Sequence, residues 1–159
     1  MSNEKVNSPG MTSKATYGDA EIILRLYELR REPVMREARK FMAFDWWPEN
    51  FDDFVKISTA GGKEYAYFRQ VTSYWDMAMS FVARGALDPN LFMDNAGEMF
   101  FLYAKLKVIV QGMRQNNPNF WRRVEEFVLG SPESLAKLRA VETNVERMRE
   151  KIRSKTAVA

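Results

Sequence analysis

The sequence predicts an all-α fold, a single-domain helical bundle of about five to seven helices with no sheet, on three observations. Apolar residues recur at intervals of three and four along most of the chain, which is the spacing of one helix face. Alternation over four or more residues, the mark of a strand, is nearly absent. The 159 residues, 46% of them hydrophobic, also suit one domain with a substantial core.

The chain divides into a short tail and one domain. Residues 1–16 are polar and lack periodicity, so we expect a flexible tail there and a single bundle over residues 17–155. The tail has no apolar segment of a secretory signal. Asp76, Lys105 and Lys107 interrupt the longest apolar runs, so no membrane contact is expected and the predicted location is cytoplasmic.

The first helical segment keeps its apolar spacing on both sides of Pro33. Its apolar positions are Ile22, Ile23, Leu26, Leu29, Val34, Ala38 and Phe41. Proline cannot donate a backbone hydrogen bond to the preceding turn. We therefore expect one kinked helix, with two helices that meet at Glu32–Pro33 as the alternative.

A short aromatic helix is expected next, with Pro48 at its first position. Two adjacent tryptophans cannot both face inward from one helix, so one of Trp46 and Trp47 should be partly exposed. This pair is a candidate protein interface. The alternative is that the aromatic cluster closes one end of the core. Gly61–Gly62 then marks a loop.

Two central helices follow, and clear punctuation lies between them. The first should run from about Lys63 to Arg84 and end at Gly85, and it is apolar over most of its circumference. Asp88 before Pro89 predicts a helix start. Asn95 and Glu98 resemble a capping box at a second start. Gly112 indicates either a close helix crossing or a fraying end.

The last two helices are expected to begin at Asn117–Pro118 and Ser131–Pro132, with Gly130 between them. The final helix carries a narrow apolar stripe. It consists of Leu135, Leu138, Val141, Val145, Met148 and Ile152. Such a seam either packs within the chain or pairs two copies, and Leu138, Val145, Met148 and Ile152 are therefore candidate interface residues.

The sequence has no His and no Cys, which excludes His- or Cys-based catalysis and zinc sites. The carboxylates Asp76, Asp88, Asp94 and Glu98 could form an acid–base or metal site, but cap roles already account for Asp88 and Glu98. Asp76 is the candidate buried polar residue. We expect it to bond with Arg69, Arg84 or a Tyr hydroxyl. No catalytic residue, cofactor or metal site is predicted.

The chain has a formal net charge of +3, and some of its basic residues form two clusters. Arg30 and Arg31 lie in the first helical segment, and Arg122 and Arg123 follow Trp121. These four are candidate contacts to an anion such as a phosphate. Interleaved glutamates at salt-bridge spacing favour a solvated surface instead, so nucleic-acid binding is possible but not favoured.

Three segments together resemble a bacterial helical domain family of unknown function. They are "YWDMAMSFVARGALDPNLF", "MFFLYAKLKVIVQGMR" and "NPNFWRRVEEFV", and the likeness spans about residues 65–129. The resemblance implies a helical fold and no assigned activity. Some members carry an N-terminal membrane helix, whereas this chain has a polar tail there.

The sequence thus favours a non-enzymatic protein that acts through protein contacts, as a homodimer or with an unknown protein partner. One alternative is a nucleic-acid-associated regulator that uses the Arg clusters. Another is a small-ligand binder with an aromatic pocket. A cavity beside Trp75 and Tyr103 would support this alternative, and a filled core there would exclude it.

Overall fold

The computed structural model describes residues 14–159, and this part of the chain is all-helical without a strand. It holds eight α-helices, one more than the upper limit that the spacing predicted, and one π-helical turn. The elements are α1 (Tyr17–Arg31), α2 (Pro33–Lys40), η1 (Phe41–Asp45), α3 (Phe51–Ala60), α4 (Lys63–Ala83), α5 (Pro89–Asn95), α6 (Gly97–Asn116), α7 (Arg122–Leu129) and α8 (Pro132–Ala157). The predicted tail falls largely outside the described residues.

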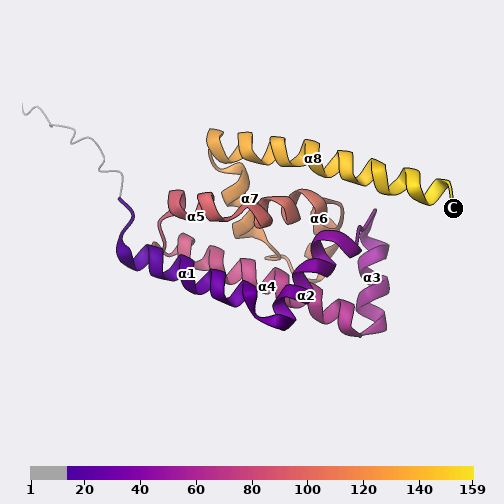
Figure 1. Ribbon diagram of the computed structural model, residues 1–159, viewed down its shortest axis with the longest axis horizontal. Coiled ribbons are helices and arrows are strands. Elements are labelled where there is room, and N and C mark those ends of the chain that lie inside the picture. Colours follow the sequence, from indigo (N-terminus) through magenta and orange to yellow (C-terminus); the bar gives the residue numbers. More distant parts are fainter. Residues whose placement is uncertain (1–13) are drawn as a thin grey trace, which may run out of the picture.

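The helices form layers around α4 and α6 (Figure 1). α8 covers α6 and α7 on one side of the molecule, and α1 lies on the opposite side, where it contacts α2 and α5. α2 packs on α4, and α3 bridges α4 and α6. Both central helices are buried on several faces, as their broad apolar surfaces predicted.

Glu32–Pro33 separates two helices, so the expectation of one kinked helix is wrong. Glu32 has an extended ψ of 138°, and its carboxylate accepts a hydrogen bond from the Met35 amide at 2.9 Å. Pro33 then takes the first position of α2, where its missing N–H costs nothing. The side-chain cap makes a new helix start preferable to a kink.

A π-helical turn follows α2, and the apolar spacing did not predict it. α2 continues into η1, which closes with a hydrogen bond from the Trp46 amide to the Phe41 carbonyl. Pro48 lies before α3 rather than in it, because Asn50 caps that helix through the Asp52 amide. Gly61, with φ +63°, ends α3 in the left-handed region that glycine adopts without strain.

The predicted boundary between the central helices is confirmed. Gly85 has φ +74° after the last turn of α4. The Asp88 carboxylate accepts a hydrogen bond from the Leu91 amide at 2.8 Å and caps α5. The Asp88 amide in turn donates to Asp19 of α1, so this turn is also tied to the first helix.

The capping box at Asn95 and Glu98 does not form. Asn95 ends α5 and donates back to the Leu91 carbonyl, and α6 starts after Ala96 without a side-chain cap. Glu98 instead lies between two distant residues. It pairs with Arg39 of α2 at 2.6 Å and accepts a hydrogen bond from the Trp75 indole at 3.2 Å. A long-range ion pair therefore replaces the local cap.

The start predicted at Asn117–Pro118 is also wrong, whereas the start at Ser131 is confirmed. Residues 117–121 form a turn, and α7 begins only at Arg122. Ser131 caps α8 in a reciprocal capping box with Ser134.

Gly112 lies at a close helix crossing, one of its two predicted roles. A Cβ atom at this position would stand 2.3 Å from Cγ of Phe51 on α3. The missing side chain thus lets the Phe51 ring lie directly on the backbone of α6, which anchors α3.

Candidate functional site

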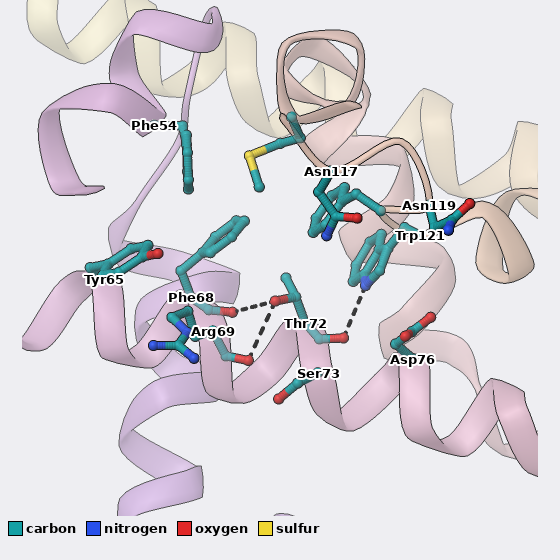
Figure 2. A pocket seen from close by; sticks show the side chains of 12 residues that line it. Phe54, Tyr65, Phe68, Arg69, Thr72, Ser73, Asp76, Asn117, Asn119 and Trp121 are labelled. Atoms are coloured by element: carbon teal, nitrogen blue, oxygen red, sulfur yellow. Dashed lines mark hydrogen bonds between the residues drawn. The ribbon is translucent and has the colours of Figure 1, made fainter. Parts of the chain in front are cut away.

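The candidate site is a pocket of about 330 Å³ between α4 and the α6–α7 connection, with α3 at one end (Figure 2). Its volume falls in the range of roughly 300–1,000 Å³ typical of small-molecule sites. Twelve residues line it. They are Phe54, Tyr65, Phe68, Arg69, Thr72, Ser73, Asp76, Met113, Asn117, Asn119, Phe120 and Trp121.

Aromatic rings form a continuous wall of the pocket. Phe68 lies between Phe54 and Phe120, with ring centres 4.9 and 6.2 Å away. Phe120 stacks on Trp121 at 5.7 Å with an interplanar angle of 5°. Four rings from three parts of the chain thus pack together, and because they are 8% exposed or less, each gives the pocket only a small part of its apolar surface.

Trp121 holds an unusual backbone conformation at this wall. Its φ of +51° makes it the one non-glycine residue with positive φ within residues 14–159. Its indole nitrogen donates to the Thr72 carbonyl of α4 at 2.9 Å (Figure 2). Residues that hold such a conformation cluster at functional sites. Apolar spacing alone predicted a helix here and missed the turn that builds the wall.

A polar strip on α4 forms the rim. Arg69, Ser73 and Asp76 lie along one face of the helix, since residues three and four apart are neighbours. Arg69 has its guanidinium 5.9 Å from the Tyr65 ring centre. Figure 2 shows Asp76 pointing from α4 toward the turn that carries Asn119 and Trp121.

The expected bond from Asp76 to Arg69, Arg84 or a tyrosine is absent. Asp76 is half-buried, and its carboxylate has no hydrogen bond or ion pair with any residue between 14 and 159. The reason is its face of α4, which borders the pocket instead of the core where Tyr74 and Trp75 lie. Asp76 therefore keeps free hydrogen-bond acceptors at the pocket.

Trp46 and Trp47 lie outside this pocket. Both are half-buried in the extended turn between η1 and α3, so the argument from a shared helix does not apply. Trp46 stacks on Phe41. Trp47 covers Lys105 of α6, which is fully buried. In the sequence this lysine is notable only because it interrupts an apolar run.

The Lys105 ammonium caps the end of the π-helical turn. It donates to the Met42 carbonyl at 2.6 Å and to the Ala43 carbonyl at 3.3 Å. Arg149 of α8, also buried, donates to the carbonyls of Pro48 and Lys105. Lys105 and Arg149 thus donate to backbone carbonyls of η1, of the turn before α3 and of α6.

The four candidate anion contacts do not form one surface in the described structure. Arg30 lies 5.5 Å from the Trp75 ring centre and is half-buried at the end of α1, with Arg31 beside it over Tyr27. Arg122 donates to the Pro118 carbonyl at the start of α7, and Arg123 is exposed next to it. α1 packs on α2 and α5, whereas α7 packs on α8, α4 and α6.

The apolar stripe of the last helix packs within the chain. Leu138 and Val145 are buried, and Met148 and Ile152 are half-buried, as α8 lies on α6 and α7. This answers the question that the sequence left open about the seam. Within the described residues the stripe therefore faces α6 and α7, and Met148 and Ile152 stay partly exposed.

A second apolar surface lies on α1, where the sequence analysis named no site. Leu24, Tyr27 and Leu29 are exposed by 61%, 49% and 50%. Beside them, a groove of about 360 Å³ runs between α1 and α4. Its lining consists of Gly18, Glu21, Ile22, Arg25, Leu26, Leu29, Met77 and Phe81. Apolar residues on several faces of α1 were the signal that could have indicated it.

The described residues do not form a pocket beside Trp75 and Tyr103, a metal site or a membrane-spanning helix. The space beside Trp75 holds only about 10 Å³, and Tyr103 is buried, so this part of the core is filled. Within residues 14–159 no group of His, Cys, Asp or Glu side chains is arranged to hold a metal. No helix in that range has both the length and the apolar character to cross a membrane.

Comparison with known proteins identifies the domain. No curated protein and no solved structure matches the chain. A family model does match residues 15–131, which is more than half of the chain and wider than the resemblance seen in the sequence. The chain therefore belongs to the DUF4760 family, a domain of unknown function.

Proposed function

We propose that this protein is a non-enzymatic binding protein whose pocket between α4 and the α6–α7 turn holds a small organic molecule. The observation that carries the proposal is the coincidence of an aromatic wall with a half-buried, unbonded carboxylate in one cavity of about 330 Å³. Ligand sites combine a mostly apolar lining with a few polar groups that fix orientation. The pocket has this composition.

Two substitutions of the same kind test the proposal. Asn117 lines the pocket, whereas its neighbour Asn116 does not, and both are exposed. Asn117→Trp should fill the mouth of the pocket, and Asn116→Trp places the same ring outside it. Saturation-transfer NMR with a set of water-soluble aromatic fragments measures binding to each protein.

We expect several fragments to bind the wild type and Asn116→Trp but not Asn117→Trp. Thermal unfolding of each variant checks that the fold is kept. If every bound fragment is insensitive to Asn117→Trp, or none binds at all, the pocket is not a ligand site.

A second candidate function, self-association, rests on the exposed apolar face of α1. The groove beside Leu29 carries Glu21 and Arg25, which lie four residues apart on the same helix face. In an antiparallel two-fold contact, Glu21 would oppose Arg25 of the partner subunit. By symmetry, Arg25 would oppose Glu21 of the partner subunit. This self-complementarity favours a second copy as the occupant.

Analytical ultracentrifugation over a range of protein concentrations tests this candidate. Leu29→Glu should abolish a dimer because it places a charge in the groove. Leu24→Glu is the control, since Leu24 is exposed on α1 but does not line the groove. A wild type that stays monomeric at high micromolar concentration would exclude self-association.

A further inference from the structure

The pocket is electrically asymmetric along α4. Arg69 and Asp76 are seven residues apart, which places them about 10 Å apart along the helix axis on the same face. Neither side chain forms a salt bridge with another residue in the range 14–159. The two ends of the pocket therefore carry opposite charges that the protein itself does not neutralise.

The middle of the pocket offers few free donors. The Thr72 hydroxyl donates to the Phe68 carbonyl at 2.8 Å, and the Trp121 indole donates to the Thr72 carbonyl at 2.9 Å. Both groups thus use their protons within the protein, as the dashed lines in Figure 2 show. A polar group at the centre of a ligand would lose its water without gaining a donor there, so the body of the ligand should be apolar.

The aromatic wall limits the apolar contact that this body can make. Phe120 stacks on Trp121 with an interplanar angle of 5°, and the Phe68 ring is within 14° of parallel to Phe120. Stacked rings cover one another's faces, and none of these three side chains is more than 8% exposed, so the ligand body meets only the small apolar area that they leave open.

Asp76 then decides the charge of the ligand. Its carboxylate is half-buried and unbonded, and a ligand ammonium would form a charge-assisted hydrogen bond with it. An ammonium at the other end would meet the guanidinium of Arg69, which repels it. The charges therefore favour one orientation over its reverse.

We infer that the pocket takes an organic amine with an apolar, ring-containing body, bound with its ammonium at Asp76 and its body beside Phe120. This inference rests on the proposed ligand-binding function and names its ligand class. Asn117 and Asn119 lie at the rim, where their amides can contact the polar end of the ligand.

Three probes with one ring system test the inference by isothermal titration calorimetry. Tryptamine carries an ammonium, 3-ethylindole is neutral and indole-3-propionate carries a carboxylate. We expect tryptamine to bind about tenfold more tightly than the other two at low salt, because a charge-assisted hydrogen bond has roughly that effect. Asn117→Trp should weaken all three.

Asp76→Asn should remove the preference for tryptamine and leave the affinity of 3-ethylindole unchanged. The matched control is Asp94→Asn, which removes the same charge from an exposed carboxylate on α5. Arg69→Gln is the complementary variant, and it should weaken indole-3-propionate while tryptamine binding is kept or strengthened.

The outcomes separate the two proposals. If all three probes bind equally and Asp76→Asn changes nothing, the pocket is a ligand site but the amine inference is wrong. If indole-3-propionate binds best, the inference is also wrong. If no probe binds at millimolar concentration, both the amine inference and the small-ligand function fail.

Discussion

The ammonium nitrogen of Lys105 lies 4.0 Å from the centre of the Trp47 ring, and the guanidinium carbon of Arg149 lies 5.7 Å from the same ring. One indole thus contacts two cations in a region closed to solvent, since Lys105 is 0% exposed and Arg149 4%. Burial, and then the charge of Arg149, lower the pKa of Lys105 to about 7. Lys105 is therefore close to neutral in the folded protein at slightly alkaline pH.

This pKa makes stability depend on pH through one residue. Between pH 7 and 10.5 the unfolded chain holds a proton on Lys105 that the folded chain has lost, so the free energy of unfolding rises with pH in this window. Each unit of pKa difference corresponds to up to about 1.4 kcal/mol. We expect the stability of the wild type relative to Lys105→Met to increase from pH 7.5 to pH 10 in urea unfolding.

Subtracting the free energy of unfolding of Lys105→Met from that of the wild type removes the contribution of other titrating groups. Lys107→Met is the control, because Lys107 is partly exposed and pairs with Glu142 at the surface. Parallel stability curves for the wild type and Lys105→Met across this pH range would show that Lys105 keeps an ordinary pKa.

Glu98 should be one of the carboxylates on which the fold depends most. It joins Arg39 of α2 and Trp75 of α4 to the start of α6, and its side chain is only 15% exposed. Glu98→Gln keeps the shape but removes the charge that Arg39 faces. We expect a loss of about 1–3 kcal/mol in the free energy of unfolding.

The control for this prediction is Glu28→Gln, which breaks the exposed pair between Arg25 and Glu28 on α1. Exposed pairs contribute little, so its unfolding midpoint in urea should barely move. Equal shifts for the two variants would contradict the linking role of Glu98.

Gly112→Ala should destabilise the protein, contrary to the usual effect of this substitution in a helix. Alanine normally stabilises a helix interior by about 1 kcal/mol relative to glycine. Here the new methyl group would overlap the Phe51 ring, with a cost of about 1–3 kcal/mol. Thermal unfolding measures the change.

Two comparisons isolate the cause. Gly97→Ala, also on α6, meets no atom within 4 Å and should be neutral or stabilising. In a Phe51→Ala background the clash is gone, so Gly112→Ala should no longer destabilise. A Gly112→Ala cost that persists in this background would place the strain elsewhere.

Much of the helical framework was predictable because helix caps are local. Asp88 and Ser131 start helices through bonds to amides three residues ahead, and Gly85 adopts the left-handed conformation that a sequence pattern can indicate. Where a distant partner competes with a local one, the pattern fails. Glu98 has cap spacing to Asn95, yet it pairs with Arg39, 59 residues away in the chain.

The pocket was harder to predict than the helices. The sequence indicates Asp76 because it is a polar residue on an apolar helix. Whether its carboxylate finds a hydrogen bond or salt bridge, however, depends on the turn that faces it. That turn follows from Trp121, whose positive φ and long-range bond to Thr72 leave no trace in apolar spacing. The sequence therefore identified one rim residue and placed the opposite wall in a helix.

The family match ends at Ser131, the residue that caps α8. Arg149, whose guanidinium donates to the Pro48 and Lys105 carbonyls, lies after that residue in the chain. A fragment cut at the family boundary would thus expose the inner faces of α6 and α7 and should be prone to aggregation. For anyone expressing this domain, the practical unit extends through α8.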